Sequence, residues 1–205
     1  SIGDVNVELR NAKIELKDLK IQNPRSFPEK MMLHAPEIAI DFDLKAFWSG
    51  KTHFEEVRLN LEELIVIRNR EGKLNVDALR PKDNAKPGPE RSSESKLPKF
   101  LIDKLVLTVG KVVYKDYSLG GDPVVQEFNI GIQNREYRNI DNPQSLVSLI
   151  MFETLTRTTL SSLVNLDLSA FQNDASGILS QGLNLLGSNK DKVQKVAENL
   201  LGIFK

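Results

Sequence analysis

The sequence predicts an α+β fold in which a curved, mostly antiparallel sheet carries helices at its C-terminal side. Apolar and polar residues alternate through most of the first 140 residues, which is typical of strands with one apolar face. The last part of the chain changes to a helical period. We therefore expect a sheet over residues 1–140 and a helical segment over 141–205 that packs on the sheet or caps its groove.

The strands of the first half follow from this alternation. Apolar residues occupy every second position in short runs that begin at Val5 and continue to Leu61. The positions between them are rich in Lys, Glu, Asp and Arg, so we expect the other face of the sheet to meet water. Residues 23–28, NPRSFP, form a break typical of a turn between two strands.

A loop divides the sheet into two halves. Residues 81–98, PKDNAKPGPERSSESKLP, combine Pro, Gly, Ser and mixed charges, which favours an exposed and flexible connection. Alternation resumes at Ile102 and ends near Ile132. The second half therefore predicts further strands of the same sheet.

The C-terminal segment reads as helices. Asn142 and Pro143 make a helix start, with a capping side chain followed by proline at the first helical position. Residues 144–187 carry only four charges but contain many Ser and Thr residues. The segment is therefore too polar for a membrane span and too apolar for free exposure. We expect Glu153 and Arg157 to pair on the exposed side of the first helix. Ser188 predicts the cap of a final helix with an apolar stripe that ends at Phe204.

Composition argues against several classes of function. Lys and Arg total 28, as do Asp and Glu, so the chain lacks the basic excess that nucleic-acid binding requires. There are no cysteines, which excludes disulfides, Cys-ligated metals and thiol catalysis. The only histidines, His34 and His53, have no third ligand nearby in sequence, so we expect no metal site and no cofactor.

Catalytic motifs are also missing. Adjacent acidic residues such as Glu55 and Glu56 point to opposite faces of a strand, so they do not converge on one substrate atom. Residues 177–182, GILSQG, have the wrong spacing for a nucleophile elbow. Neither a phosphate-binding loop nor a dinucleotide-binding glycine motif occurs. The sequence therefore predicts a protein that is not an enzyme.

Several segments resemble the AsmA-like family in their order. Residues 14–27, IELKDLKIQNPRSF, resemble its opening hairpin and turn, with Ser26 where glycine is usual. The alternating strand at 38–44 and the segment 47–50, FWSG, are similar to the family's next strand and short connecting helix. Residues 66–75, VIRNREGKLN, resemble the family stretch that follows.

The resemblance continues after the loop and covers roughly residues 5–118. Residues 102–105 followed by 110–116, GKVVYKD, are similar to the family's hairpin of strand, glycine and strand ending in Tyr-x-Asp. An LEA-14-like β-sandwich is the alternative resemblance, since it also has paired strands and an Asn-Pro turn. The stretch at 68–75 favours the AsmA-like family.

The resemblance implies a bacterial envelope protein that contributes to phospholipid transport or outer-membrane biogenesis. Its β-groove domain would lie in the periplasm, held to the inner membrane by an anchor upstream of this chain. Long bridge-forming members are far longer, so one such module could not span an envelope. The C-terminal helices are not part of the family pattern.

Two hypotheses from different classes remain open. In the first, inward-facing residues shelter a phospholipid or other acyl lipid, because a 16-carbon chain in water costs roughly 13 kcal/mol at about 0.8 kcal/mol per methylene. In the second, the face is a closed core and the helices dock an envelope protein partner. The lipid-contacting candidates are Ile14, Leu16, Ile38, Ile40, Phe42, Val57, Leu59, Leu61, Leu105, Leu107, Phe128 and Ile130.

Overall fold

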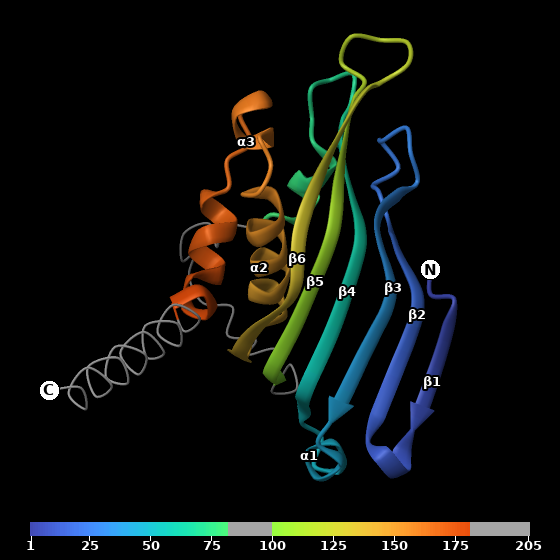
Figure 1. Cartoon of the computed structure of the whole chain (residues 1–205), viewed down its shortest axis with the longest axis vertical. Coiled ribbons are helices and arrows are strands. Elements are labelled where there is room, and N and C mark those ends of the chain that lie inside the picture. The colour runs from blue at the N-terminus through green and yellow to red at the C-terminus, as the bar shows by residue number, and fades with distance from the viewer. Residues whose placement is uncertain (82–99, 181–205) are drawn as a thin grey trace, which may run out of the picture.

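The computed structural model describes residues 1–81 and 100–180. Its centre is a six-stranded sheet in which the strands lie side by side in sequence order (Figure 1). All neighbours pair antiparallel except β4 and β5, which are parallel. This confirms the predicted α+β class with a curved, mostly antiparallel sheet. The strands are β1 (Asp4–Glu8), β2 (Lys13–Gln22), β3 (Met31–Phe42), β4 (Thr52–Arg68), β5 (Phe100–Asp116) and β6 (Val124–Ile140).

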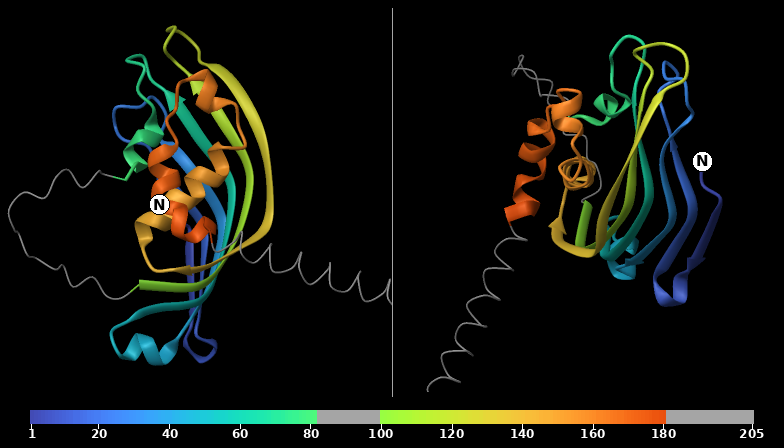
Figure 2. Two further views of the ribbon diagram at one scale, coloured as in Figure 1. Left: turned by 90° about the vertical axis from the view of Figure 1, so that its left-hand side faces the viewer. Right: turned by 45° about the horizontal axis from the view of Figure 1, so that its top comes forward.

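The helices form two layers over one side of the sheet. Figure 2 shows α2 (Pro143–Leu155) next to the sheet and the helix over residues 169–180 on the far side of α2. Helix α2 packs on β5 and β6. The shorter elements are η1 (Leu9–Asn11), α1 (Leu44–Trp48), η2 (Asn75–Leu79) and α3 (Leu160–Leu163). No helix in the described part of the chain is long and apolar enough to cross a bilayer.

Helix α2 begins as predicted but is buried on most sides. The Asn142 side chain accepts a hydrogen bond from the Gln144 backbone N–H at 2.8 Å, so the predicted cap is confirmed. Glu153 does pair with Arg157, at 3.8 Å, but its side chain is only 8% exposed and lies in the interior. The expectation of an exposed pair was therefore wrong, because Glu153 faces β6, where its carboxylate lies 3.0 Å from Arg135.

A left-handed residue keeps the apolar side chains of β2 on one face. Asp18 has φ of 54° and lies between Leu16, which pairs with Ile38, and Leu19, which pairs with Ala35. Without this irregularity, residues three apart on a strand would point to opposite faces. With Asp18 in this conformation, Leu16 and Leu19 both pack against the core, so two short apolar runs of the sequence lie on one face.

Gly110 does not form the hairpin that the family resemblance implies. It lies inside β5, which runs unbroken for 17 residues. A Cβ atom added at Gly110 would lie 2.6 Å from the carbonyl oxygen of Glu62 on β4, so glycine permits a close approach of the two strands. All of the predicted loop at 81–98 except Pro81 lies outside the described residues, as does the predicted final helix from Ser188 to Phe204.

Candidate functional site

Two rows of apolar side chains cross the sheet from β1 to β5. Directly paired residues of neighbouring strands point to the same face, so each row is continuous. We call them the apolar rows. The first row is Val5, Leu16, Ile38, Leu59 and Leu107, and the second is Val7, Ile14, Ile40, Val57 and Leu105.

In both rows the member on β5 is the least exposed and the member on β1 is the most exposed. Leu105 and Leu107 on β5 are 0% exposed, in the core that the helices cover. The members on β2 are half-buried. Val5 and Val7 on β1 are 50% and 52% exposed. One end of the rows is therefore closed core, and the other end is an apolar surface in contact with water.

The predicted lipid-contacting residues divide between these two environments. Ile14, Leu16, Ile40 and Leu59 are half-buried members of the rows. Ile38 and Val57 are nearly covered, while Leu61, Leu105, Leu107 and Ile130 are buried in the core and offer little or no surface to a guest. Phe42 is buried against the ring of Phe47, and Phe128 packs against the edge of the core.

Sequence reasoning left four apolar side chains of this surface out of the candidate set. Val5 and Val7 extend the rows onto β1, and Leu19 and Ile21 extend the same face along β2. Ile21 is 41% exposed. The alternation that marked the other candidates also contains these residues. The alternation does not give the register, which shows that Val5 and Val7 are the cross-strand neighbours of the candidates Leu16 and Ile14.

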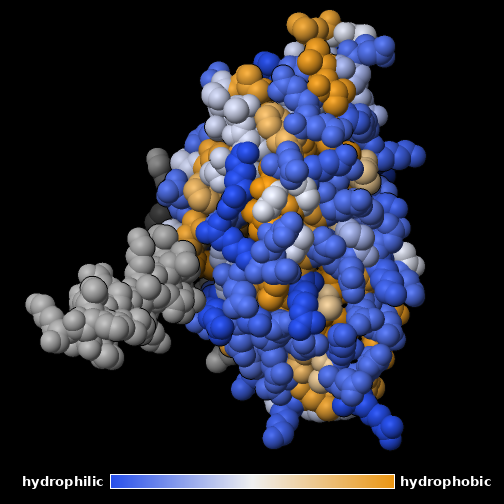
Figure 3. Space-filling view, viewed as in Figure 1, coloured by the Kyte–Doolittle hydropathy of each residue, from blue (hydrophilic) through white to orange (hydrophobic). Residues whose placement is uncertain are grey.

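The opposite face of the sheet carries a network of charges. Glu56 on β4 lies 2.6 Å from the Lys104 ammonium on β5, and Arg58 approaches the other oxygen of the same carboxylate. The hydrogen bond from Lys104 is the main cause that lowers the pKa of Glu56. A hollow of about 250 Å³ on this face is lined mainly by polar and charged residues, Lys13 and Arg58 among them. Figure 3 shows hydrophilic residues over much of the visible surface.

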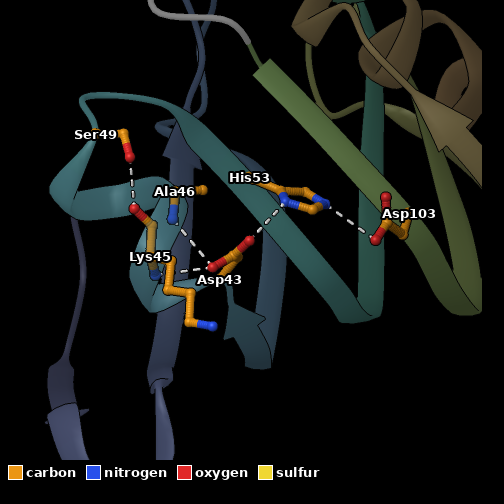
Figure 4. A network of polar contacts seen from close by, with 6 residues as sticks. All are labelled: Asp43, Lys45, Ala46, Ser49, His53 and Asp103. Atoms are coloured by element: carbon orange, nitrogen blue, oxygen red, sulfur yellow. Dashed lines mark hydrogen bonds and ion pairs between the residues drawn. The ribbon is translucent and has the colours of Figure 1, made fainter.

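Each histidine bridges two carboxylates on different elements. His53 lies 3.3 Å from Asp43 and 3.0 Å from Asp103 of β5 (Figure 4). The hydrogen bond to Asp103 is the largest of the effects that raise the pKa of His53. The second oxygen of Asp43 accepts hydrogen bonds from the backbone of Lys45 and Ala46, which caps α1.

His34 is held in the same way, between Asp18 at 2.8 Å and Glu62 at 2.7 Å. These contacts connect β2, β3 and β4 on the charged face. Across residues 1–81 and 100–180, no group of three or more His, Asp or Glu side chains is placed to hold a metal ion. Both histidines therefore have a structural role. Each joins neighbouring strands, and His53 also contacts the carboxylate that caps α1.

Comparison with known proteins adds no relative. No family model matches the chain, and no curated protein or solved structure gives a significant match. The function must therefore be argued from the chemistry of the surfaces described above.

Proposed function

We propose that this protein is a non-enzymatic lipid-binding protein that shelters acyl chains on the open end of the apolar rows. The observation that carries the proposal is the exposure gradient, from fully buried Leu107 to half-exposed Val5 within one row. A sheet face that is apolar throughout but only partly covered gives a hydrocarbon chain a surface that is continuous with the core.

The dimensions of the open end suit one acyl chain. From Ile14 to Ile21, β2 extends about 23 Å at roughly 3.3 Å per residue. One bilayer leaflet provides about 15 Å of hydrocarbon, half of the roughly 30 Å core. A 16-carbon chain with half of its surface covered would gain roughly 6 kcal/mol at about 0.8 kcal/mol per methylene, before the costs of ordering it.

The cellular setting of the proposal rests on the resemblance to the AsmA-like family. It favours a periplasmic protein, anchored to the bacterial inner membrane by a segment upstream of this chain, that contributes to phospholipid transport or outer-membrane biogenesis. The charged face and the absence of a metal cluster among the described residues are compatible with carriage, which needs no reacting groups.

The closed core under α2 favours a second candidate, an envelope scaffold with a closed core and a protein partner docked on the C-terminal helices. Leu149, Leu155 and Phe171 are 0% exposed between the sheet and the helical layers. Leu163 on α3 is 51% exposed and faces no core. In this candidate the open end of the rows would carry no lipid.

A pair of variants on β1 separates the two candidates. Val7→Lys places a charge on the apolar rows, whereas Asn6→Lys places the same charge on the opposite face of the same exposed strand. Lipid extraction and native mass spectrometry of the purified proteins should find co-purifying phospholipid in the wild type and in Asn6→Lys, and much less in Val7→Lys. Lipid-free wild-type protein, or equal lipid in both variants, would overturn the proposal.

The absence of cysteine allows a direct probe of the surface. A single cysteine introduced at Val7 can be labelled with an environment-sensitive fluorophore, with Asn6→Cys as the matched control. Palmitate should shift the emission of the label at position 7 to shorter wavelength and leave the label at position 6 unchanged. No shift at position 7 at any palmitate concentration would favour the scaffold.

A further inference from the structure

Three exposed apolar side chains gather at one end of the sheet. Leu9 of η1 is 59% exposed, and Phe47 and Trp48 of α1 are 59% and 77% exposed. Both elements lie at the lower end of the molecule in Figures 1 and 2. The backbone N–H of Phe42, just before α1, donates to the carbonyl of Ala12, just after η1, at 2.9 Å. We call Leu9, Phe47 and Trp48 the aromatic tip, after the two rings that make up most of it.

The aromatic tip is held in place by ordered contacts. Phe42 is only 6% exposed, and its ring centroid lies 5.9 Å from that of Phe47. Phe47 in turn meets Trp48 edge-on at 6.0 Å. Asp43 caps α1 with two backbone hydrogen bonds and contacts His53 (Figure 4). A row of rings thus leads from the interior to Trp48, and the exposure of Trp48 is built into the fold.

Basic side chains outnumber acidic ones around the aromatic tip, where Glu8 and Asp43 are the adjoining acidic residues and the Glu8 carboxylate accepts hydrogen bonds from Asn6 and Asn11. Residues 9–13 and 44–52 contain four basic residues and no Asp or Glu. Lys13 is paired with Glu15, whereas within the described chain no carboxylate lies at ion-pair distance from Arg10, Lys45 or Lys51. The nearby Asp43 carboxylate is occupied by the cap and by His53.

We propose that the aromatic tip docks on the surface of an anionic lipid bilayer. Tryptophan and phenylalanine side chains are stabilised at the boundary between head groups and hydrocarbon, where an apolar ring loses contact with water. Unpaired Lys and Arg beside them are attracted to anionic head groups. An apolar tip with unpaired Lys and Arg side chains beside it therefore fits an anionic membrane better than a neutral one.

Docking would bring the open end of the apolar rows close to the membrane. Val7 lies two residues before Leu9, and Ile40 lies two residues before Phe42, so the second of the apolar rows passes close to the tip. The inference does not depend on acyl-chain binding, because a protein that carries no lipid could dock in the same way. The two proposals are tested by different variants.

Trp48 is the only tryptophan of the chain, so its fluorescence reports on the tip alone. The full 205-residue protein is mixed with vesicles of phosphatidylcholine, with and without phosphatidylglycerol. With the anionic vesicles, we expect the emission to shift to shorter wavelength and acrylamide quenching to fall. The shift should weaken as salt is added, since salt screens the attraction between exposed charges.

Vesicle flotation of variants measures the contribution of each group. Lys45→Glu and Lys51→Glu should each weaken binding to anionic vesicles about fivefold or more. Phe47→Ser should weaken it about tenfold. Leu119→Ser is the matched control, because Leu119 is 84% exposed in the loop between β5 and β6, at the other end of the sheet. It should bind as the wild type does.

Two results would overturn the proposal. One is Trp48 emission that no vesicle composition changes, even if the protein floats with the vesicles through another segment or meets a protein partner instead. The other is a result in which the Phe47→Ser variant and the Lys51→Glu variant both float with anionic vesicles as much as the wild type does. Val7→Lys should lose bound acyl lipid and still shift its Trp48 emission on anionic vesicles, so failure of the acyl-binding proposal is distinguishable from failure of this one.

Discussion

Replacing Asn75 by alanine should destabilise the protein by about 3–5 kcal/mol. The Asn75 side chain is 0% exposed and makes four hydrogen bonds. Its oxygen accepts from the backbone N–H of Ile67 at 2.8 Å and of Val76 at 2.9 Å. Its nitrogen donates to the Ile65 carbonyl and to the Asn23 side chain, both at 2.7 Å.

The magnitude follows from the groups that the variant leaves without a partner. A buried polar group without a hydrogen bond costs about 1–3 kcal/mol, and alanine leaves two N–H groups and one carbonyl in that state. Three such groups sum to about 3–9 kcal/mol, and water that enters the vacated space would recover part of this cost, which limits the expected loss to about 3–5 kcal/mol. The network joins the turn after β2 to the start of η2, so the loss should act on the whole sheet.

Chemical denaturation followed by circular dichroism measures this loss. Asn60→Ala is the matched control, because Asn60 is exposed on the charged face, and it should change the free energy of unfolding by less than about 0.5 kcal/mol. A loss below about 1 kcal/mol in Asn75→Ala, or an equal loss in both variants, would show that the buried network does not stabilise the fold as argued.

Three further predictions concern single contacts. Gly110→Ala should lower the thermal midpoint markedly, because its Cβ meets the Glu62 carbonyl oxygen at 2.6 Å; an unchanged midpoint would mean that the strands separate at little cost. Glu153→Ala should cost roughly 1–3 kcal/mol in a denaturation curve, since the carboxylate is 8% exposed and lies 3.0 Å from Arg135, which is itself partly exposed. His53→Gln tests pH dependence. The pKa of His53 is raised in the folded state, so its stabilising contribution is complete below its unfolded pKa of about 6.5 and is lost as pH rises through the folded pKa. The stability difference between wild type and His53→Gln should therefore shrink from pH 6 to pH 8, and a difference that grows would contradict this.

The period of the strands could be predicted from sequence because it depends only on neighbouring residues. The helix cap at Asn142 was predictable for the same reason. The burial of Glu153 was not, because i and i+4 spacing reports that two residues are neighbours and not which side of the helix meets water. Glu153 faces β6, where Arg135 lies 3.0 Å from its carboxylate, and the packing of α2 on β6 is a property of the folded chain.

Gly110 illustrates a different limit. A glycine between two apolar runs is typical of a turn and equally of a close approach between strands. The sequence near Gly110 is the same in both cases, and only the position of Glu62 on the neighbouring strand distinguishes them. Asn75 is similar, since its partner Asn23 lies 52 positions away in the sequence.

The candidate site depends on a distinction that alternation cannot make. Leu16 and Leu107 occupy the same row and have the same place in the pattern, yet one is half-buried and the other is fully buried. The difference arises because α2 packs on β5 and β6, at the edge of the sheet farthest from β1. The open surface that we propose for an acyl chain and the core of the fold are thus made from one face. Their boundary is set by the helical cover, so substitutions on β1 and β2 should affect lipid binding with little loss of stability, while those on β5 should affect stability first.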